Sequence, residues 1–319
     1  MRRRRGGCRG CVVTLAVLVA GALWVRHAAP GWRDTWDLQV TRLDVPVPGL
    51  PAELDGMTVG HITDLHAGND VPDAFVRKAL QAVADARPDM IVLTGDYISY
   101  DWRNLLRIQR DLARLRPRLG VYACLGNHDV YVGRQRHITE ILEQAGVHVL
   151  VNSALPFPGR RDAWVVGLGD PVTEQQDFAA ALDKVPPASF KLLLAHSSDV
   201  LDAAADLGVD LVLAGHTHGG QVSLPLIGPP IVPTKGGPKY AWGLFDCRGT
   251  RLFVNRGVGV VNPCVRLCCP PEVAILRLRK ADWKLSEGRW GLDLRGPAEW
   301  LHERSQQVRK LVPGFSVTE

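Results

Sequence analysis

The N-terminal region lacks the ~20 consecutive apolar residues that a full membrane-spanning helix needs. Its charge-free apolar run covers residues 11–25, and fifteen helical residues extend only about 22 Å. This length fits the core of a signal peptide or a short signal anchor; a soluble helix fits less well because nothing amphipathic flanks the run. An A-x-A cleavage pattern at residues 20–22 lies inside the run, so we expect the segment to be retained as an anchor.

Positive charge flanks this run on its N-terminal side. Five arginines occupy positions 2, 3, 4, 5 and 9, and tryptophans follow at positions 24, 32 and 36. Basic residues stay on the cytoplasmic side of a membrane, and tryptophans favour its interface. The sequence therefore predicts a membrane-associated protein (inner or plasma membrane) whose large domain lies on the extracytoplasmic side.

The rest of the chain lacks a surplus of positive charge. The formal net charge is +5, and the five N-terminal arginines account for all of it. Enzymes that follow a nucleic acid backbone usually carry a basic body, so the composition argues against a nucleic acid partner. With 319 residues, 46% hydrophobic and 22% charged, the chain is long and apolar enough for one large folded domain or two small ones.

The seven cysteines lack the arrangement of a disulfide framework. Cys8 and Cys11 form a C-x-x-C pair with no second pair, which disfavours a zinc site. Five cysteines remain in the body, an odd number. The cysteines therefore do not indicate the compartment in which the protein works.

Short apolar runs alternate with amphipathic segments along the body, a pattern typical of α/β layering. Predicted strands cover residues 57–63, 89–93, 121–125, 147–151, 164–167, 190–195, 210–214, 251–254 and 273–278, and predicted helices cover residues 72–86, 102–115 and 136–145. So many strands fit two packed sheets better than one. The predicted fold is an α/β two-sheet sandwich flanked by helices and preceded by the N-terminal membrane segment.

The same patterns divide the chain into four segments. They are a basic leader and signal anchor (1–26), a proline-containing connector (27–56), the main domain (57–280) and a C-terminal extension (281–319). Residues 225–238 are rich in proline and glycine and predict a surface loop. Residues 297–311 predict a short amphipathic helix in the extension.

Residue types that bind metals follow the ends of five predicted strands. The segments are Asp64-Leu65-His66, Gly95-Asp96, Gly126-Asn127-His128-Asp129, His196 and Gly215-His216-Thr217-His218. In layered α/β folds, ligands bind at the carboxyl ends of the strands. We therefore expect these five segments to converge on one site.

The spacing within the segments supports shared metal ligation. In an extended strand end, residues two apart face the same side, so Asp64 and His66 can reach one ion, and so can His216 and His218. A glycine precedes three of these polar groups and permits a close approach of the backbone. Carboxylate, imidazole and amide ligands suit divalent ions such as Mn, Fe or Zn.

The order D-x-H, G-D, G-N-H-D, H and G-H-x-H resembles the calcineurin-like metallophosphoesterase superfamily, over roughly residues 57–278. The arginine-rich leader, the string Gly-His-Thr-His-Gly-Gly-Gln, Asn-Arg-Gly-Val-Gly at 255–259 and Pro-Glu-Val at 271–273 are similar to its bacterial membrane-associated phosphodiesterase branch. Some members of that branch hydrolyse the pyrophosphate of UDP-2,3-diacylglucosamine in lipid A synthesis. The resemblance implies the two-sheet fold and a centre of two divalent ions.

The resemblance also implies a role for each residue of the five segments. Asp96 bridges both ions, one further held by Asp64, His66 and His218 and the other by Asn127, His196 and His216. His128 is then left to act as a general acid or to stabilise charge at the leaving oxygen. Asp129 orients His128 or sets its protonation state, with a helix N-cap as the alternative. Arg256 and Tyr240 are predicted to contact the phosphate and the leaving group, with a structural role as the alternative.

The expected function is hydrolysis of a phosphodiester or pyrophosphate by a metal-bound hydroxide. The leader favours a lipid- or nucleotide-linked substrate such as UDP-2,3-diacylglucosamine, although an extracytoplasmic domain would be separated from a cytoplasmic UDP-lipid. A protein or nucleotide phosphatase is an alternative. A catalytically silent metal-binding membrane scaffold is another, and the intact His128 and complete ligand pattern argue against it. The sequence does not indicate the oligomeric state.

Overall fold

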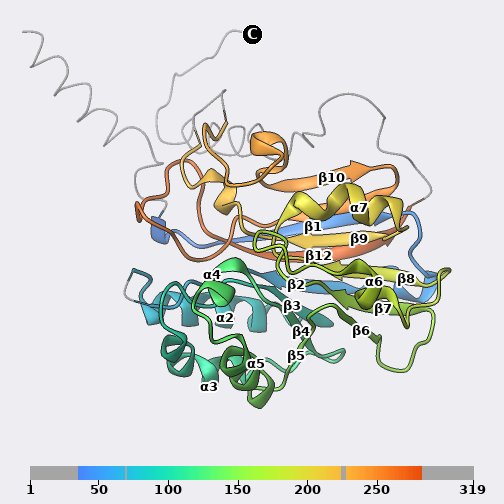
Figure 1. The fold of residues 1–319 in the computed structure, drawn as a ribbon, viewed down its shortest axis with the longest axis horizontal. Coiled ribbons are helices and arrows are strands. Elements are labelled where there is room, and N and C mark those ends of the chain that lie inside the picture. The colour runs from blue at the N-terminus through green and yellow to red at the C-terminus, as the bar shows by residue number, and fades with distance from the viewer. Residues whose placement is uncertain (1–34, 69, 224–227, 282–319) are drawn as a thin grey trace, which may run out of the picture.

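The computed structural model describes residues 35–68, 70–223 and 228–281 (Figure 1). The predicted anchor at residues 11–25 and the predicted helix at residues 297–311 lie outside these ranges. Within them, every helix is too short or too polar to cross a bilayer.

The first sheet has six strands. Four of them, β2 to β5, are adjacent and parallel to one another. In spatial order the strands are β1 (Gln39–Val47), β12 (Glu272–Lys280), β2 (Thr58–Ile62), β3 (Met90–Thr94), β4 (Val121–Cys124) and β5 (Val147–Val149). Strand β12 pairs antiparallel with β2 and parallel with β1. The last strand of the domain therefore joins its first strand to the rest of the sheet.

The second sheet also has six strands, of which β11, β9, β8 and β7 are parallel neighbours. In spatial order they are β10 (Gly243–Cys247), β11 (Thr250–Val254), β9 (Leu211–Ala214), β8 (Phe190–Leu194), β7 (Ala163–Gly167) and β6 (Ser153–Pro156). The two edge strands β10 and β6 pair antiparallel with their neighbours. Two mixed sheets confirm the predicted two-sheet α/β architecture.

Helices cover the outer faces of both sheets. The α-helices are α2 (Asp73–Asp85), α3 (Gln109–Leu112), α4 (Asn127–Tyr131), α5 (Gln135–Gln144), α6 (Phe178–Leu182) and α7 (Leu201–Asp206). The 3-10 helices are η2 (Ala52–Leu54), η3 (Trp102–Arg107), η4 (Ser198–Val200), η5 (His218–Gly220) and η6 (Gly237–Tyr240). Apolar residues of α2, α3 and α5 pack on the first sheet, and those of α6 and α7 pack on the second. In Figure 1, α2, α3 and α5 gather at one end of the molecule.

The interior strands are buried on both faces and divide their side chains between two cores. In β3, Met90 and Val92 belong to the core between the sheets, whereas Ile91 and Leu93 pack against the helices. Successive side chains of a strand point to opposite faces, so a continuous apolar run supplies both cores at once. Strands with such a continuous apolar run are the ones whose positions the sequence predicts best.

The strands that the sequence pattern did not predict are all edge strands. Strand β1 lies within the predicted connector 27–56, and β6 and β10 also lie at sheet edges. Only the last three residues of β1 are buried, so it lacks a long apolar signal. Pro46 is tolerated there because an edge strand need not donate every backbone N–H. The sheet therefore extends N-terminal of residue 57, where the main domain was expected to begin.

The single helix predicted over residues 102–115 is interrupted in the structure. Residue Ile108 has φ −113° and ψ 0°, and it ends η3 and begins α3. The apolar periodicity continues across the break, since Leu105, Ile108 and Leu112 are all buried. The apolar pattern correctly predicted which side chains are buried, but it did not predict the change of backbone conformation at Ile108.

Candidate metal centre

The predicted site residues follow the carboxyl ends of neighbouring parallel strands. Strands β2, β3 and β4 of one sheet and β8 and β9 of the other each lead into one of the five polar segments. All seven predicted ligand residues are buried: Asp64, His66, Asp96, Asn127, His196, His216 and His218. The topology therefore brings together segments that are spread over about 150 residues of sequence.

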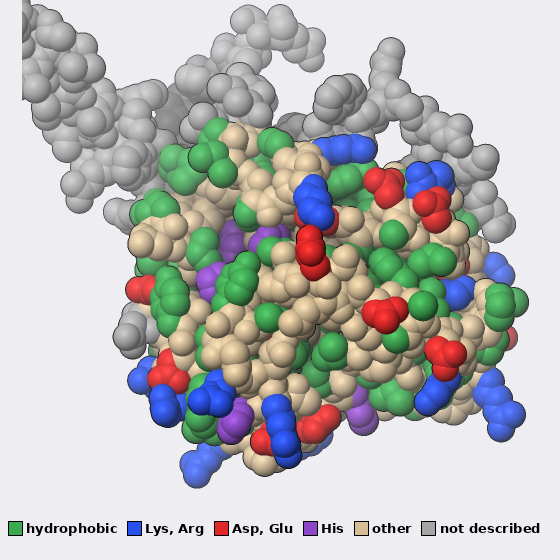
Figure 2. Space-filling model, viewed as in Figure 1, with side chains coloured by type: hydrophobic (Ala, Val, Ile, Leu, Met, Phe, Trp, Pro, Cys, Tyr) green, Lys and Arg blue, Asp and Glu red, His purple; other side chains and the backbone are tan. Residues whose placement is uncertain are grey.

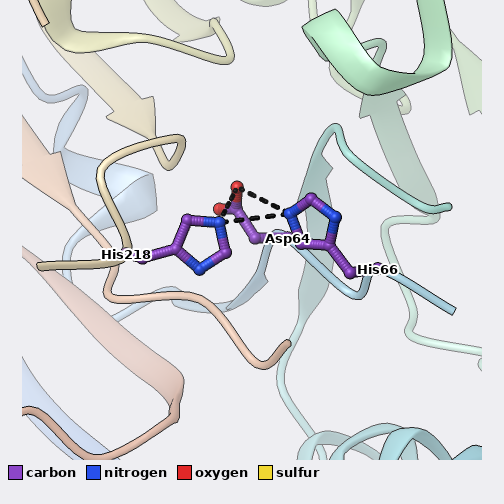
Figure 3. A group of neighbouring side chains, drawn as sticks. All are labelled: Asp64, His66 and His218. Atoms are coloured by element: carbon purple, nitrogen blue, oxygen red, sulfur yellow. Dashed lines mark hydrogen bonds and ion pairs between the residues drawn. The ribbon is translucent and has the colours of Figure 1, made fainter. Parts of the chain in front are cut away.

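Asp64, His66 and His218 form the first group that could hold a metal ion (Figure 3). The Nε2 atoms of His66 and His218 lie 3.1 Å apart. Asp64 Oδ1 is 3.4 Å from His218 Nε2 and 4.0 Å from His66 Nε2. Side chains from two distant segments of the chain thus direct their ligand atoms to one point.

Asp96, His196 and His216 form a second group of the same kind. His196 Nε2 is 3.2 Å from both Asp96 Oδ2 and His216 Nδ1. The amide oxygen of Asn127 adds a fourth ligand atom, 3.0 Å from His196 Nε2. This group therefore offers two nitrogen and two oxygen atoms.

One oxygen of Asp96 lies between the two groups. Asp96 Oδ2 is 3.5 Å from His66 Nε2 in the first group and 3.2 Å from His196 Nε2 in the second. The other oxygen, Oδ1, accepts a hydrogen bond from the backbone N–H of His128 at 2.9 Å. The backbone fixes one oxygen, so the other remains directed at both groups.

Outward hydrogen bonds set the tautomers of two of the imidazoles. His196 Nδ1 lies 2.7 Å from the carbonyl oxygen of Thr94, and His216 Nε2 lies 2.8 Å from that of Pro233. A carbonyl oxygen accepts, so these outward nitrogens carry the proton and donate. In the neutral imidazole each inward nitrogen is then left with a lone pair, the arrangement that metal-ligating histidines require. The donor set therefore fits divalent metal ions.

Asp96 and His196 stabilise each other's charged forms within the cluster. Burial raises the pKa of Asp64 to about 6 and lowers the pKa of His66 to about 3. Burial opposes the charged forms of Asp96 and His196 as well, but each stabilises the charge of the other. The pKa of Asp96 is consequently held below its usual range, and that of His196 is raised to about 10. The cluster thus favours a positive charge next to Asp96. A divalent cation bound at this site would supply such a charge.

The backbone at the site differs from the extended strand end that the spacing suggested. Asp64 (φ 53°), His66 (φ 47°), Asp96 (φ 54°), His216 (φ 68°) and His218 (φ 50°) all have left-handed conformations. Such a conformation is unfavourable for residues with a Cβ atom and is concentrated at functional sites. His216 and His218 belong to different groups instead of facing one ion together, whereas Asp64 and His66 share a group as expected.

Two of the predicted glycines allow the close approach that the spacing suggested. A Cβ atom at Gly126 would lie 2.3 Å from Asp96 Oδ1. At Gly215 it would lie 2.4 Å from Asp64 Oδ2. Any larger residue at either position would displace a carboxylate of the site.

The expected contact between Asp129 and the His128 ring was wrong. The buried Asp129 carboxylate accepts hydrogen bonds from the backbone N–H groups of Asp96 (2.8 Å), Tyr97 (3.0 Å) and Gly126 (2.9 Å). The His128 ring is held instead through Nδ1, 3.1 Å from the carbonyl oxygen of Ser99. Asp129 thus joins two site loops and caps the first turn of α4, close to the capping alternative.

Arg256 and Tyr240 lie outside the metal-binding groups of the described chain. Arg256 is buried and pairs with Glu272 at 3.1 Å, and its guanidinium lies over the ring of Trp242. The ring of Tyr240 packs against Phe245 at 5.0 Å between centroids. These contacts support the structural alternative for both residues, and their contact with substrate remains a prediction.

Asp170 follows β7 and lies buried behind the second group. Its Oδ2 accepts from the backbone N–H of Thr173 at 2.8 Å. Its charge also acts to raise the pKa values of His196 and His216. The Gly169-Asp170 pair at the end of β7 was the available signal, because this strand ends at the same sheet edge as β8.

Arg266 is a buried residue behind the first group that no sequence motif singled out. Its guanidinium lies 3.3 Å from His218 Nδ1. It donates to the backbone carbonyls of His218, Arg256, Gly257, Gly259 and Cys269. These carbonyls belong to loops that pack against Asp64 and His66. Arg266 therefore holds the loops around the first group in place.

Replacing Arg266 by methionine is expected to lower the free energy of unfolding by about 3 kcal/mol, because buried carbonyls would lose their donors. Urea unfolding followed by circular dichroism measures the change. Arg248→Met is the control, since Arg248 is half-exposed and its surface ion pairs contribute at most about 1 kcal/mol. Equal stability of the two variants would contradict this role.

Comparison with known proteins identifies the family. Residues 57–220 match the family described as "Calcineurin-like phosphoesterase". Phosphodiesterase YaeI of Escherichia coli (strain K12) is 36% identical over 226 residues, 68% of this chain and 80% of YaeI. UDP-2,3-diacylglucosamine pyrophosphatase LpxG of Chlamydia muridarum is 29% identical over 327 residues, 84% of this chain and 97% of LpxG. "Transmembrane protein with metallophosphoesterase domain" of Danio rerio is 29% identical over 257 residues, 76% of this chain and 58% of that protein. The chain therefore belongs to the calcineurin-like phosphoesterase family and is a metal-dependent phosphoester hydrolase.

Proposed function

We propose that the protein uses two divalent metal ions to hydrolyse a phosphodiester or pyrophosphate in a lipid- or nucleotide-linked substrate. The observation that carries the proposal is the position of Asp96 Oδ2, within 3.5 Å of an imidazole of each group. One ion would be held by Asp64, His66, His218 and Asp96. The second would be held by Asp96, Asn127, His196 and His216.

The two ions, when bound, supply Lewis acidity at the phosphoryl oxygens. Proton transfer falls to His128, which is half-buried and lies beside the first group, its ring centroid 4.8 Å from that of His66. Because Nδ1 donates to the Ser99 carbonyl, Nε2 is the ring nitrogen that can carry a proton to the leaving oxygen. The Ser99 carbonyl fixes the orientation of the ring for this transfer.

The names of the relatives support a diester or pyrophosphate over a monoester. YaeI is named a phosphodiesterase and LpxG a pyrophosphatase of a nucleotide-linked lipid. Both substrates have a phosphorus atom flanked by two substituents, of which one leaves. We extend that substrate class to this chain.

The purified protein is expected to hydrolyse bis-p-nitrophenyl phosphate faster than p-nitrophenyl phosphate. The assay follows release of p-nitrophenolate after chelation, with Mn, Fe and Zn added back singly and in pairs. Activity should be lost on chelation and return with metal, because the ligand atoms are nitrogen and oxygen. A preference for the monoester would favour the phosphatase alternative, and activity without metal would contradict the centre.

We also propose that the leader attaches the enzyme to a membrane with the catalytic domain outside the cytoplasm. The arginines before residue 10 and the apolar run at 11–25 support this orientation, and the Danio rerio relative is named a transmembrane protein.

A reporter fused after residue 319 is therefore expected to give an exported signal, measured as periplasmic alkaline phosphatase activity in a bacterial host. Replacing the five leader arginines by glutamine should weaken that preference. Activity of a cytoplasmic reporter at the same position would overturn the orientation. Such a result would instead place the enzyme on the side where UDP-linked lipids are found.

A further inference from the structure

Two tyrosines beside His128 expose most of their surface. Tyr100 is 70% exposed and Tyr131 is 65% exposed, whereas the metal-binding residues next to them are buried. Single exposed apolar side chains are ordinary on protein surfaces. Two aromatic rings next to the same functional imidazole are a more specific arrangement. In Figure 2, histidine side chains are visible on the surface with hydrophobic side chains around them.

Both rings contact the histidine at similar distances and angles. The Tyr100 ring centroid lies 6.4 Å from that of His128 at 70°, and the Tyr131 centroid lies 6.1 Å away at 66°. Tyr100 follows Ser99, whose carbonyl oxygen holds the His128 ring. Tyr131 is the last residue of α4, which begins next to His128. The same short segments therefore position the catalytic imidazole and both tyrosines.

The exposed tyrosine rings suit a flat, unsaturated ligand better than an acyl chain. An acyl chain gains most from enclosed aliphatic surface, which removes it from water on all sides. A nucleobase can stack on an open aromatic ring and keep its polar edge in water. Stacking tolerates every base because each has a π-face.

We propose that Tyr100 and Tyr131 form an aromatic subsite that binds the base of a nucleoside 5′-phosphate part of the substrate. This inference rests on the proposed function, since it places a nucleotide beside His128. Among the substrates proposed above, it selects those with a nucleotide. Affinity for a base on such rings is worth roughly 5- to 100-fold.

The test compares ligands that differ only in the base. Calorimetry on the metal-loaded full chain in detergent gives the dissociation constants of UMP, AMP and ribose 5-phosphate. Wild-type protein is expected to bind both nucleotides roughly 5- to 100-fold more tightly than ribose 5-phosphate. Tyr100→Leu and Tyr131→Leu should each reduce that ratio, and the double variant should bring it close to one. The affinity for ribose 5-phosphate itself should not change, because the phosphate contacts remain.

Tyr100→Phe and Tyr131→Phe are the matched controls, since they keep the ring and remove only the hydroxyl. They should retain the ratio, and so should Leu155→Ala, which alters an exposed apolar side chain on the edge strand β6. Equal affinities in the wild type, or an unchanged ratio in the double leucine variant, would overturn the subsite. Loss of dodecyl phosphate binding in place of nucleotide binding would also overturn it and indicate an acyl-chain site. Hydrolysis of bis-p-nitrophenyl phosphate, measured on the same samples, reports separately on the proposed function.

Discussion

Asp96→Asn is expected to remove nearly all activity and at least one of the two metal ions. Asp96 Oδ2 is the atom that faces both groups, and the pKa of its carboxyl is held low by His196 after the opposing effect of burial. An amide of the same shape has no negative charge to share between two cations. Losing about 4 kcal/mol of transition-state stabilisation corresponds to on the order of 10³-fold in rate.

Two measurements on the same purified variant check this expectation: metal content by elemental analysis, and kcat/KM for the diester. Asp162→Asn is a suitable control because Asp162 is an exposed carboxylate whose ion pair with Arg160 lies at the surface. The control should keep its metal content and its activity within a factor of about two. If Asp96→Asn keeps two ions per chain and near-normal turnover, Asp96 does not bridge them.

The interior of the fold is predictable because interior strands are buried on both faces. Strand β9 consists entirely of apolar residues and β3 has only one polar residue, at its end, so their apolar runs are detected directly in the sequence. Edge strands such as β1 bury one face over part of their length, and their alternation is too weak to distinguish from a connector. Strand β1 pairs with β12, a segment more than 200 residues away in the sequence. The local sequence of β1 does not indicate which strand it pairs with.

The membership of the candidate centre could also be predicted, whereas its geometry could not. The motifs Asp64-Leu65-His66 and Gly215-His216-Thr217-His218 identify which side chains converge. The left-handed backbone at His216 and His218 depends on tertiary contacts, such as the hydrogen bond from His216 N to Asp64 Oδ2 at 3.0 Å. Arg266 had no local signal because its partners are backbone carbonyls, which every sequence supplies.

His128→Ala separates chemistry from metal binding at one position. His128 forms a further group that could hold a metal ion together with His66 and Asp96, but the proposed function gives it no place in either coordination shell. Its backbone N–H, which alanine retains, supports Asp96. Removing the ring should therefore leave both ions bound. If Nε2 gives a proton to the leaving oxygen, turnover should fall by about 10²–10⁴-fold, the usual contribution of general acid catalysis.

The dependence on the leaving group tests the role of the His128 ring directly. p-Nitrophenolate needs little protonation as it leaves, so the variant should lose much less rate on bis-p-nitrophenyl phosphate than on an ester with an alkoxide leaving group. His137→Ala, which removes an exposed imidazole outside the metal-binding groups of the described residues, serves as the control. Loss of an ion from His128→Ala would make His128 a ligand. An equal loss of rate on both esters would indicate that the ring binds the phosphate before reaction, because only proton transfer depends on the basicity of the leaving oxygen.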